Sequence, residues 1–186
     1  MGKTVDRSHL RRGALRHALP LLLAMLASPG HAAQVAPITL TDLAGHDIAF
    51  PAQLPAERTL VLVAFRHADQ DVLAGWKQKL ALTGAMDDWL EIPVIGVSMG
   101  PVKAMIRQGM RKRYQDAHDL AHVAPLFGDA GAHARMLDLS PQAVGVMVVA
   151  RSGLILASVS GPVSDEAARR IAAAWHPADA KGAPHP

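Results

Sequence analysis

The sequence predicts an α/β protein in which a mixed central β-sheet is packed between helices as a three-layer α/β/α sandwich. Two largely apolar runs, at 60–65 and 92–99, have the composition of central strands that are buried on both faces. A segment with helical spacing follows each run, and this alternation is typical of a mainly parallel sheet. Two further apolar runs, at 144–150 and 154–160, are joined by only three residues, which predicts an antiparallel hairpin at one edge.

Residues 1–32 have the three parts of a secretory signal peptide: a basic stretch, an apolar run at 18–27, and small residues before a cleavage point. We expect cleavage after Ala32 by the general secretory pathway. The adjacent Arg11 and Arg12 leave the twin-arginine route as an alternative. The apolar run is shorter than the roughly 20 residues that cross a bilayer, so we expect no membrane span after cleavage; a retained anchor is the alternative. These features predict a periplasmic protein.

The charge and cysteine content of the sequence exclude two classes of function. The predicted signal holds five of the 19 Lys and Arg side chains and one of the 16 Asp and Glu side chains. The remaining 14 cations and 15 acids give a net charge of −1, which implies no nucleic-acid partner. Because the chain contains no cysteine, it forms no disulfide and performs no thiol chemistry.

The first predicted element after the signal is a hairpin over 37–50, with alternating apolar residues and Gly45 at the turn. After the first central strand, apolar residues at three- or four-residue steps predict a helix over 69–90. That spacing places Trp76 and Trp89 in the core.

The second central strand is followed by a predicted helix over 101–116, opened by Pro101. A short strand over 123–127 and a small helix over 130–137 come next. The apolar side chains of the helix over 101–116 are expected to face the core: Val102, Met105, Ile106 and Met110. Its basic side chains indicate either a docking surface for an acidic partner or a solvated helix face: Lys103, Arg107, Arg111, Lys112 and Arg113.

The last predicted element is a helix with Ser164 as its N-cap and with Ile171 and Trp175 on the core side. The predicted domain therefore covers 33–176. Residues 177–186, rich in Pro and Ala, are expected to form a disordered tail.

This order of elements resembles the thioredoxin-like superfamily, in particular peroxiredoxins and membrane-anchored, TlpA-like thioredoxins. The hairpin sequence ITLTDLAG at 38–45 and the following strand LVLVAF at 60–65 carry the resemblance. It implies a thioredoxin-like fold whose active-site loop follows that strand. In this chain the loop reads HADQDVL at 67–73 and lacks the redox cysteines, and Val144 stands where thioredoxins have a cis-proline. The resemblance therefore implies a redox-inactive relative.

The segments 137–155 and 160–166 also resemble the C-terminal half of the ATPase-complex-ten assembly factors, and they are similar to the YtfJ family of periplasmic proteins. The first resemblance implies a role in assembling a membrane complex. The second implies no particular activity. Neither resemblance assigns a role to a residue of this chain.

His67, Asp69 and Asp71 occupy alternate positions after the first central strand, where open α/β sheets place their ligands. On an extended loop they share one side and form a candidate binding loop that suits a divalent metal or a His-Asp acid-base pair. The alternative is a solvated helix start, with Asp69 as a cap and Asp71 facing the helix dipole.

His118 and His122, four residues apart, are a second candidate for metal ligation, with chance surface histidines as the alternative. We assign no catalytic residue and no resident cofactor. The leading hypothesis is a redox-inactive protein that binds or helps to assemble another envelope protein. The competing hypothesis is a metal-binding or acid-base site at His67, Asp69 and Asp71.

Overall fold

A computed structural model describes residues 33–82, 86–114 and 117–177 of the chain. The predicted signal peptide and all of the predicted tail except Pro177 lie outside these residues. Among the described helices, none combines the length and the apolar character needed to span a membrane.

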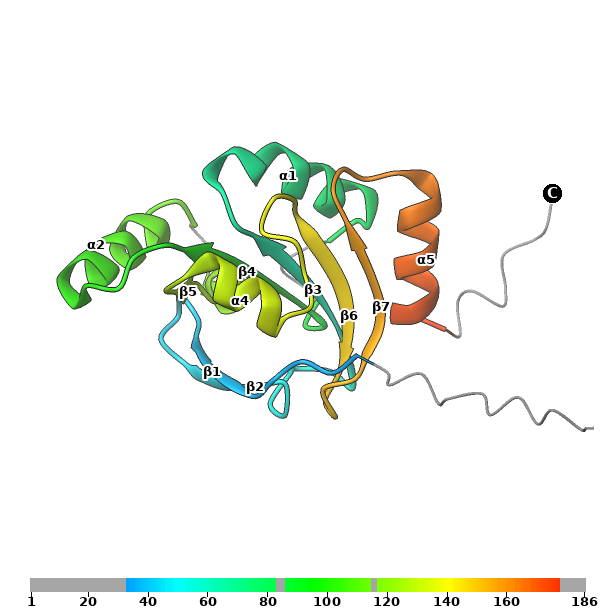
Figure 1. Cartoon of the computed structure of the whole chain (residues 1–186), viewed down its shortest axis with the longest axis horizontal. Helices are drawn as coiled ribbons and strands as arrows, with labels where there is room; N and C mark the ends of the chain where they lie inside the picture. Colours follow the sequence, from blue (N-terminus) through cyan, green and yellow to red (C-terminus); the bar gives the residue numbers. More distant parts are fainter. Residues whose placement is uncertain (1–32, 83–85, 115–116, 178–186) are drawn as a thin grey trace, which may run out of the picture. The chain divides into compact units, whose positions relative to one another are not determined.

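The central element of the described chain is strand β3, which pairs in parallel with β4 and in antiparallel with β6 (Figure 1). Within the described residues it is the middle strand of a five-stranded sheet in the order β5-β4-β3-β6-β7. This mixed sheet with its closing hairpin confirms the prediction. The strands are β3 (Arg58–Ala64), β4 (Trp89–Ile95), β5 (Leu126–Phe127), β6 (Gly145–Ala150) and β7 (Ile155–Ser160).

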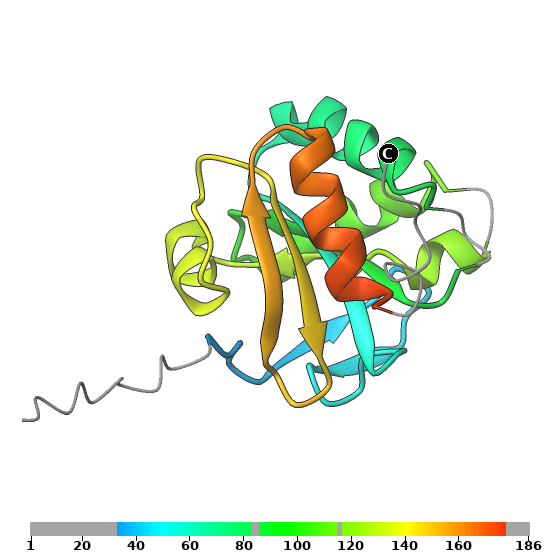
Figure 2. The ribbon, with the colours of Figure 1, turned by 90° about the vertical axis from the view of Figure 1, so that its right-hand side faces the viewer.

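Two apolar clusters cover the two faces of the sheet and make it the middle of three layers. On one face, Leu60 and Leu62 of β3 pack in a cluster with residues of α1 (Gln70–Lys79) and α5 (Asp165–Trp175). Figure 2 shows α5 lying across β6 and β7 on this face. On the other face, Val61 and Val63 cluster with residues of the N-terminal hairpin and of α4 (Ala130–Met136). Alternate side chains of β3 therefore pack into the two apolar clusters, one on each face of the sheet.

The N-terminal hairpin is formed by β1 (Ile38–Thr41) and β2 (Asp47–Phe50), as predicted. Its turn depends on Asp42, whose Oδ1 accepts hydrogen bonds from the backbone N–H groups of Gly45 and His46 at 2.6 and 2.8 Å. Gly45 has a φ of +105°, a conformation in which a β-carbon would be strained. The turn thus confirms the role predicted for this glycine.

The helix predicted over 69–90 is wrong in its second half. Helix α1 ends at Lys79, and Ala81 has a positive φ of 52° that a continuing helix cannot accommodate. Trp89 instead begins β4 and is aligned with Leu60 of β3. Strand pairing therefore determines the conformation of Trp89, although its side chain is buried as predicted.

Helix α2 (Gly100–Arg111) lies beside the ends of β4 and β5 rather than over a face of the sheet (Figure 1). None of its residues, all of which are described, is buried. The prediction that Met105 faces the core is wrong, because 65% of this residue is exposed. Val102, Ile106 and Met110 are half-buried.

Of the four remaining elements, three differ little from expectation. The strand and the helix predicted at 123–127 and 130–137 correspond to β5 and α4. A short helix, α3 (Ala117–Ala121), was not predicted. Helix α5 has the predicted N-cap, because Ser164 Oγ accepts a hydrogen bond from the N–H of Ala167 at 3.2 Å.

A buried ion pair joins α1 to β4. Glu91 lies within β4 with only 2% of its surface exposed. Lys77 Nζ of α1 forms an ion pair with its Oε2, an atom that has no hydrogen-bond partner in the described part of the chain. Lys77 also lies over the ring of Trp89, at 5.3 Å from the centroid. Among the described residues, the buried carboxylate has Lys77 as its ion-pair partner for charge compensation.

We expect Lys77→Met to lower the free energy of unfolding by about 3–5 kcal/mol, because it leaves the Glu91 charge buried without a partner. Urea denaturation measures this loss. Lys79→Met is the matched control on the same helix. Lys79 pairs with the exposed Asp165, and such surface pairs contribute about 1 kcal/mol or less. Equal losses in the two variants would contradict the assignment.

Candidate functional site

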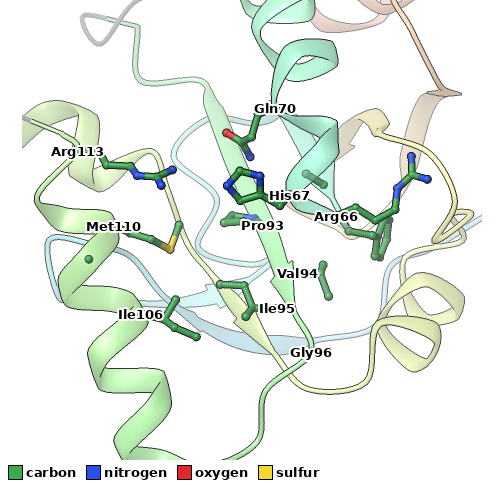
Figure 3. A pocket seen from close by; sticks show the side chains of 13 residues that line it. Arg66, His67, Gln70, Pro93, Val94, Ile95, Gly96, Ile106, Met110 and Arg113 are labelled. Carbon is green, nitrogen blue, oxygen red and sulfur yellow. The ribbon is translucent and has the colours of Figure 1, made fainter.

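A cavity of about 490 Å³ opens at the carboxyl ends of β3 and β4, between the start of α1 and the face of α2 (Figure 3). It is partly open to solvent. Most of its lining is apolar and comes from three stretches of chain: Ala64, Phe65, Arg66, His67 and Gln70; Pro93, Val94, Ile95 and Gly96; and Ile106, Gly109, Met110 and Arg113. Its size is that of sites that bind small molecules or a few residues of a peptide.

The parallel pairing of β3 with β4 determines where this cavity lies. Ala64 is aligned with Pro93, so the two strands reach the same edge of the sheet and both chains leave it there. The crevice outside the carboxyl ends of parallel strands is the usual ligand position in open α/β sheets. Helix α2 closes one side of this crevice with Ile106 and Met110.

Three polar side chains stand at the mouth of the cavity. Figure 3 shows the imidazole of His67 beside Gln70, with the Arg113 guanidinium directed toward them from the turn after α2. Among the described residues that line the cavity, none is acidic. Within the described part of the chain, these three side chains form no hydrogen bond or ion pair. They are hydrogen-bond donors available to a ligand.

The turn that leads from β3 into α1 is held by an ion pair between Arg66 and Asp69. Asp69 is 2% exposed, and its carboxylate accepts hydrogen bonds from the Arg66 backbone N–H at 3.1 Å and from Arg66 Nη2 at 2.6 Å. The side-chain hydrogen bond with Asp69 raises the pKa of Arg66. This pair defines the backbone that presents His67 to the cavity.

The structure does not bring together the three residues of the predicted binding loop. His67 lines the cavity, Asp69 is engaged by Arg66, and Asp71 is exposed on the first turn of α1. Asp69 stands at the N-cap position of α1 but makes no side-chain capping bond to that helix. In the described ranges, no group of three or more His, Cys, Asp or Glu residues has the geometry to hold a metal ion. That these residues bind a metal or act as an acid-base pair remains a prediction.

Of the second predicted pair, His118 and His122, the described His122 does not line the cavity. The side chain of His118 lies outside what the structure describes. His122 is 5% exposed and stacks on Trp89, with ring centroids 4.3 Å apart and planes 3° apart. Its Nδ1 is 2.9 Å from the Trp89 carbonyl oxygen. His122 is therefore part of the packing at the start of β4.

Sequence reasoning missed most of the cavity. Gln70, Ile106 and Met110 line it but were predicted as ordinary helix residues. Arg113 was counted only as one of five cations on a basic helix. Amphipathic spacing shows that a helix has an apolar side, but it does not show that this side borders a crevice. No sequence signal identifies these residues as a group.

The fold that positions this site is thioredoxin-like: a hairpin, a β-α-β unit, a closing antiparallel hairpin and a terminal helix around a mixed sheet. No protein-family model and no curated protein matches the sequence.

Solved structures with similar folds include the N-terminal domain of PilB from Neisseria gonorrhoeae, which is 13% identical over 74% of this chain and 87% of that one, with a TM-score of 0.49. A secreted disulfide oxidoreductase from Mycobacterium tuberculosis is 18% identical over 73% and 95%, with a TM-score of 0.45. The mitochondrial 2-Cys peroxiredoxin from Plasmodium falciparum is 10% identical over 83% and 99%, with a TM-score of 0.47. With similarities this low, the fold assignment rests on this chain's own topology. The function must be argued from its own site.

Tyr114, just after α2, is half-buried next to the site and carries the largest perturbation of a pKa around it. Burial is the main cause, and the negative charges of Glu91 and Asp119 add to it. Together they raise its pKa from an ordinary value of 10.0 to about 12. The phenol is therefore protonated and uncharged throughout the physiological pH range.

We expect the folded protein to form tyrosinate near pH 12, whereas the chain in denaturant should do so near pH 10. Near-ultraviolet absorbance measures this directly, because the sequence contains a single tyrosine. The folded state retains the proton more tightly, so Tyr114 leaves stability unchanged below pH 10 and lowers it as the pH rises from 10 toward 12. Titration near pH 10 in a chain that circular dichroism shows to be folded would contradict this environment.

We expect Asp69→Asn to lower the free energy of unfolding by about 1–3 kcal/mol, because the amide keeps the shape but loses the charge that Arg66 contacts. Asp71→Asn is the matched control, since Asp71 is exposed in the first turn of α1 and forms no ion pair with a described residue. Its loss should be less than about 1 kcal/mol. Urea denaturation of both variants measures the difference. Losses of the same size would show that the ion pair does not stabilise the turn.

Proposed function

We propose that this chain is an exported, redox-inactive thioredoxin-like protein that binds a segment of another envelope protein and assists its assembly. The observation that carries the proposal is the open apolar cavity at the carboxyl ends of β3 and β4, in a chain without cysteine. The cavity can hold a ligand by burial and hydrogen bonding. It offers no thiol with which to react. The basic and apolar parts of residues 1–32 support export.

The surface around the cavity favours a polypeptide segment as the occupant. Gly109 lines the cavity, and Met105, one helical turn earlier, continues the apolar surface of α2 into solvent. Met99, before the helix, is 66% exposed. Methionine side chains are flexible and adapt to varied apolar partners, and they are frequent on surfaces that bind several peptides. An apolar strip that extends beyond the cavity suits a ligand longer than a small molecule.

The charges around the cavity favour an acidic segment. Helix α2, which is described in full and borders the cavity, contains no acidic residue. It has three cations outside the cavity lining, Lys103, Arg107 and Arg111. Arg113 adds a fourth at the mouth. Complementary charge on a partner would increase the rate of association and disfavour basic partners. The proposed occupant is therefore an extended segment that is both apolar and acidic.

A photoreactive amino acid at position 109 tests this proposal in the envelope of the source bacterium. Apart from its chain neighbours and its own helix backbone, a β-carbon at Gly109 would meet no atom within 4 Å, so the position has space for a side chain. We expect irradiation to give one reproducible adduct, because the position lines the cavity. Mass spectrometry of the adduct should identify an apolar, acidic segment of an envelope protein.

The matched control places the same photoreactive residue at Arg170, which is exposed on α5 and does not line the cavity. It should give no such adduct. The proposal fails if position 109 gives no adduct, or if both positions capture the same proteins with equal yield.

A further inference from the structure

We infer that the mouth of the cavity is a carboxylate-binding subsite, formed by Arg113, His67 and Gln70, that selects an acidic side chain inside an apolar segment of the partner. This inference rests on the proposed function and specifies what the partner segment must carry. The juxtaposition of three donor side chains with an apolar floor carries the argument.

The three mouth residues come from two separate parts of the chain. His67 and Gln70 stand at the start of α1, whereas Arg113 follows α2. Figure 3 shows that their polar ends nevertheless face the same space above Pro93. Their donor groups include a planar guanidinium, whose fork geometry suits the two oxygens of a carboxylate. The side-chain amide of Gln70 and an imidazole N–H supply further donors.

The two arginines that line the cavity differ in their electrostatic state. The charge of Arg66 is compensated by the carboxylate of Asp69, because Asp69 Oδ1 lies 2.6 Å from Arg66 Nη2. Arg113 has no such partner within the described part of the chain, and none of the described lining residues is acidic. An anion entering the cavity therefore meets one uncompensated positive charge, at Arg113. This places the anion subsite at the α2 side of the mouth.

The floor beneath this subsite is apolar. Ile95, Ile106 and Met110 lie on the α2 side of the cavity, on the side from which Arg113 reaches over (Figure 3). An anion alone would leave this surface exposed, and an apolar group alone would leave the Arg113 charge without a partner. A ligand with a carboxylate next to an apolar side chain satisfies both.

The carboxylate is assigned to an internal Asp or Glu residue of the partner. The cavity is partly open to solvent, so a side chain bound in it can belong to a chain that runs outside it. The exposed Met105 extends the apolar surface past the cavity, where the continuing chain would lie. A terminal carboxylate or a free fatty acid would use the mouth and the floor but would leave this extension unused.

Short labelled peptides test the inference by fluorescence anisotropy with the full chain. The probes share an extended sequence of alternating leucine and serine with one central residue, which is Glu, Gln or Lys, and both ends are blocked. We expect the Glu peptide to bind about tenfold more tightly than the Gln peptide, because a charged hydrogen-bonded pair is lost in the latter. The Lys peptide should bind more weakly still.

Arg113→Gln should remove the preference for Glu over Gln, and His67→Ala should reduce it. Arg170→Gln removes the same charge from α5, which does not line the cavity, and should leave the preference intact. Unchanged thermal midpoints in all three variants exclude misfolding as the cause. A preference for Glu that survives in Arg113→Gln overturns the inference.

The other outcomes separate this inference from the proposed function. Equal binding of the Glu and Gln peptides, weakened by Met110→Asp, overturns the carboxylate subsite and leaves the apolar binding groove in place. Tighter binding of a Gln peptide with a free C-terminus overturns the choice of an internal acid. Octanoate that binds as tightly as the Glu peptide overturns the choice of a polypeptide. Failure of every probe to bind overturns the inference, whereas the adduct at position 109 decides the proposed function independently.

Discussion

The burial of β3 on both faces is the constraint on which the rest of this structure depends. Its side chains alternate between a cluster with α1 and α5 and a cluster with the N-terminal hairpin and α4. Both edges of the strand are paired, with β4 on one side and β6 on the other. Neither the position nor the register of β3 can therefore change without disturbing both clusters, because a shift by one residue would exchange the two faces. The end of this strand is a fixed point on which a site can be placed.

The site combines a rigid part with a less constrained one. Strand ends and the Arg66–Asp69 turn fix His67 and the floor at Pro93 and Ile95. Helix α2, by contrast, has no buried residue, and polar side chains connect it to the rest of the fold. Lys103 and Arg107 lie over the ring of Phe127. Arg111 Nε donates a hydrogen bond to the Leu43 carbonyl oxygen. Because α2 does not pack tightly against the sheet, a cavity remains between the helix and the ends of β3 and β4. This loose packing also leaves Met105 of the helix exposed to solvent.

Prediction from sequence succeeded where local pattern and tertiary environment agree. The β1–β2 hairpin, the central strands, the β6–β7 hairpin and the Ser164 cap each have a signal contained within a few residues. The helix prediction failed at Trp89. Its spacing from the preceding apolar residues is compatible with a helix, but it is the first residue of β4. Prediction failed again at Met105, because an apolar stripe on a helix identifies a side without identifying what covers it. For the candidate site, it selected the loop that borders the cavity and one residue that lines it, His67, but it grouped that residue with Asp69 and Asp71, which do not line the cavity.

The sequence by itself determined the α/β class, the order of the strands and of the longer helices, and the absence of thiol chemistry, because composition and short-range periodicity are properties of the chain before it folds. Only the tertiary structure decided that Asp69 neutralises Arg66. It also decided that Arg113, 47 positions after Arg66, lines the same cavity as His67 without an ion-pair partner among the described residues. The physical reason is that charge compensation depends on distance in space. Parallel pairing of β3 with β4 brings the start of α1 and the end of α2 together across an intervening strand and helix.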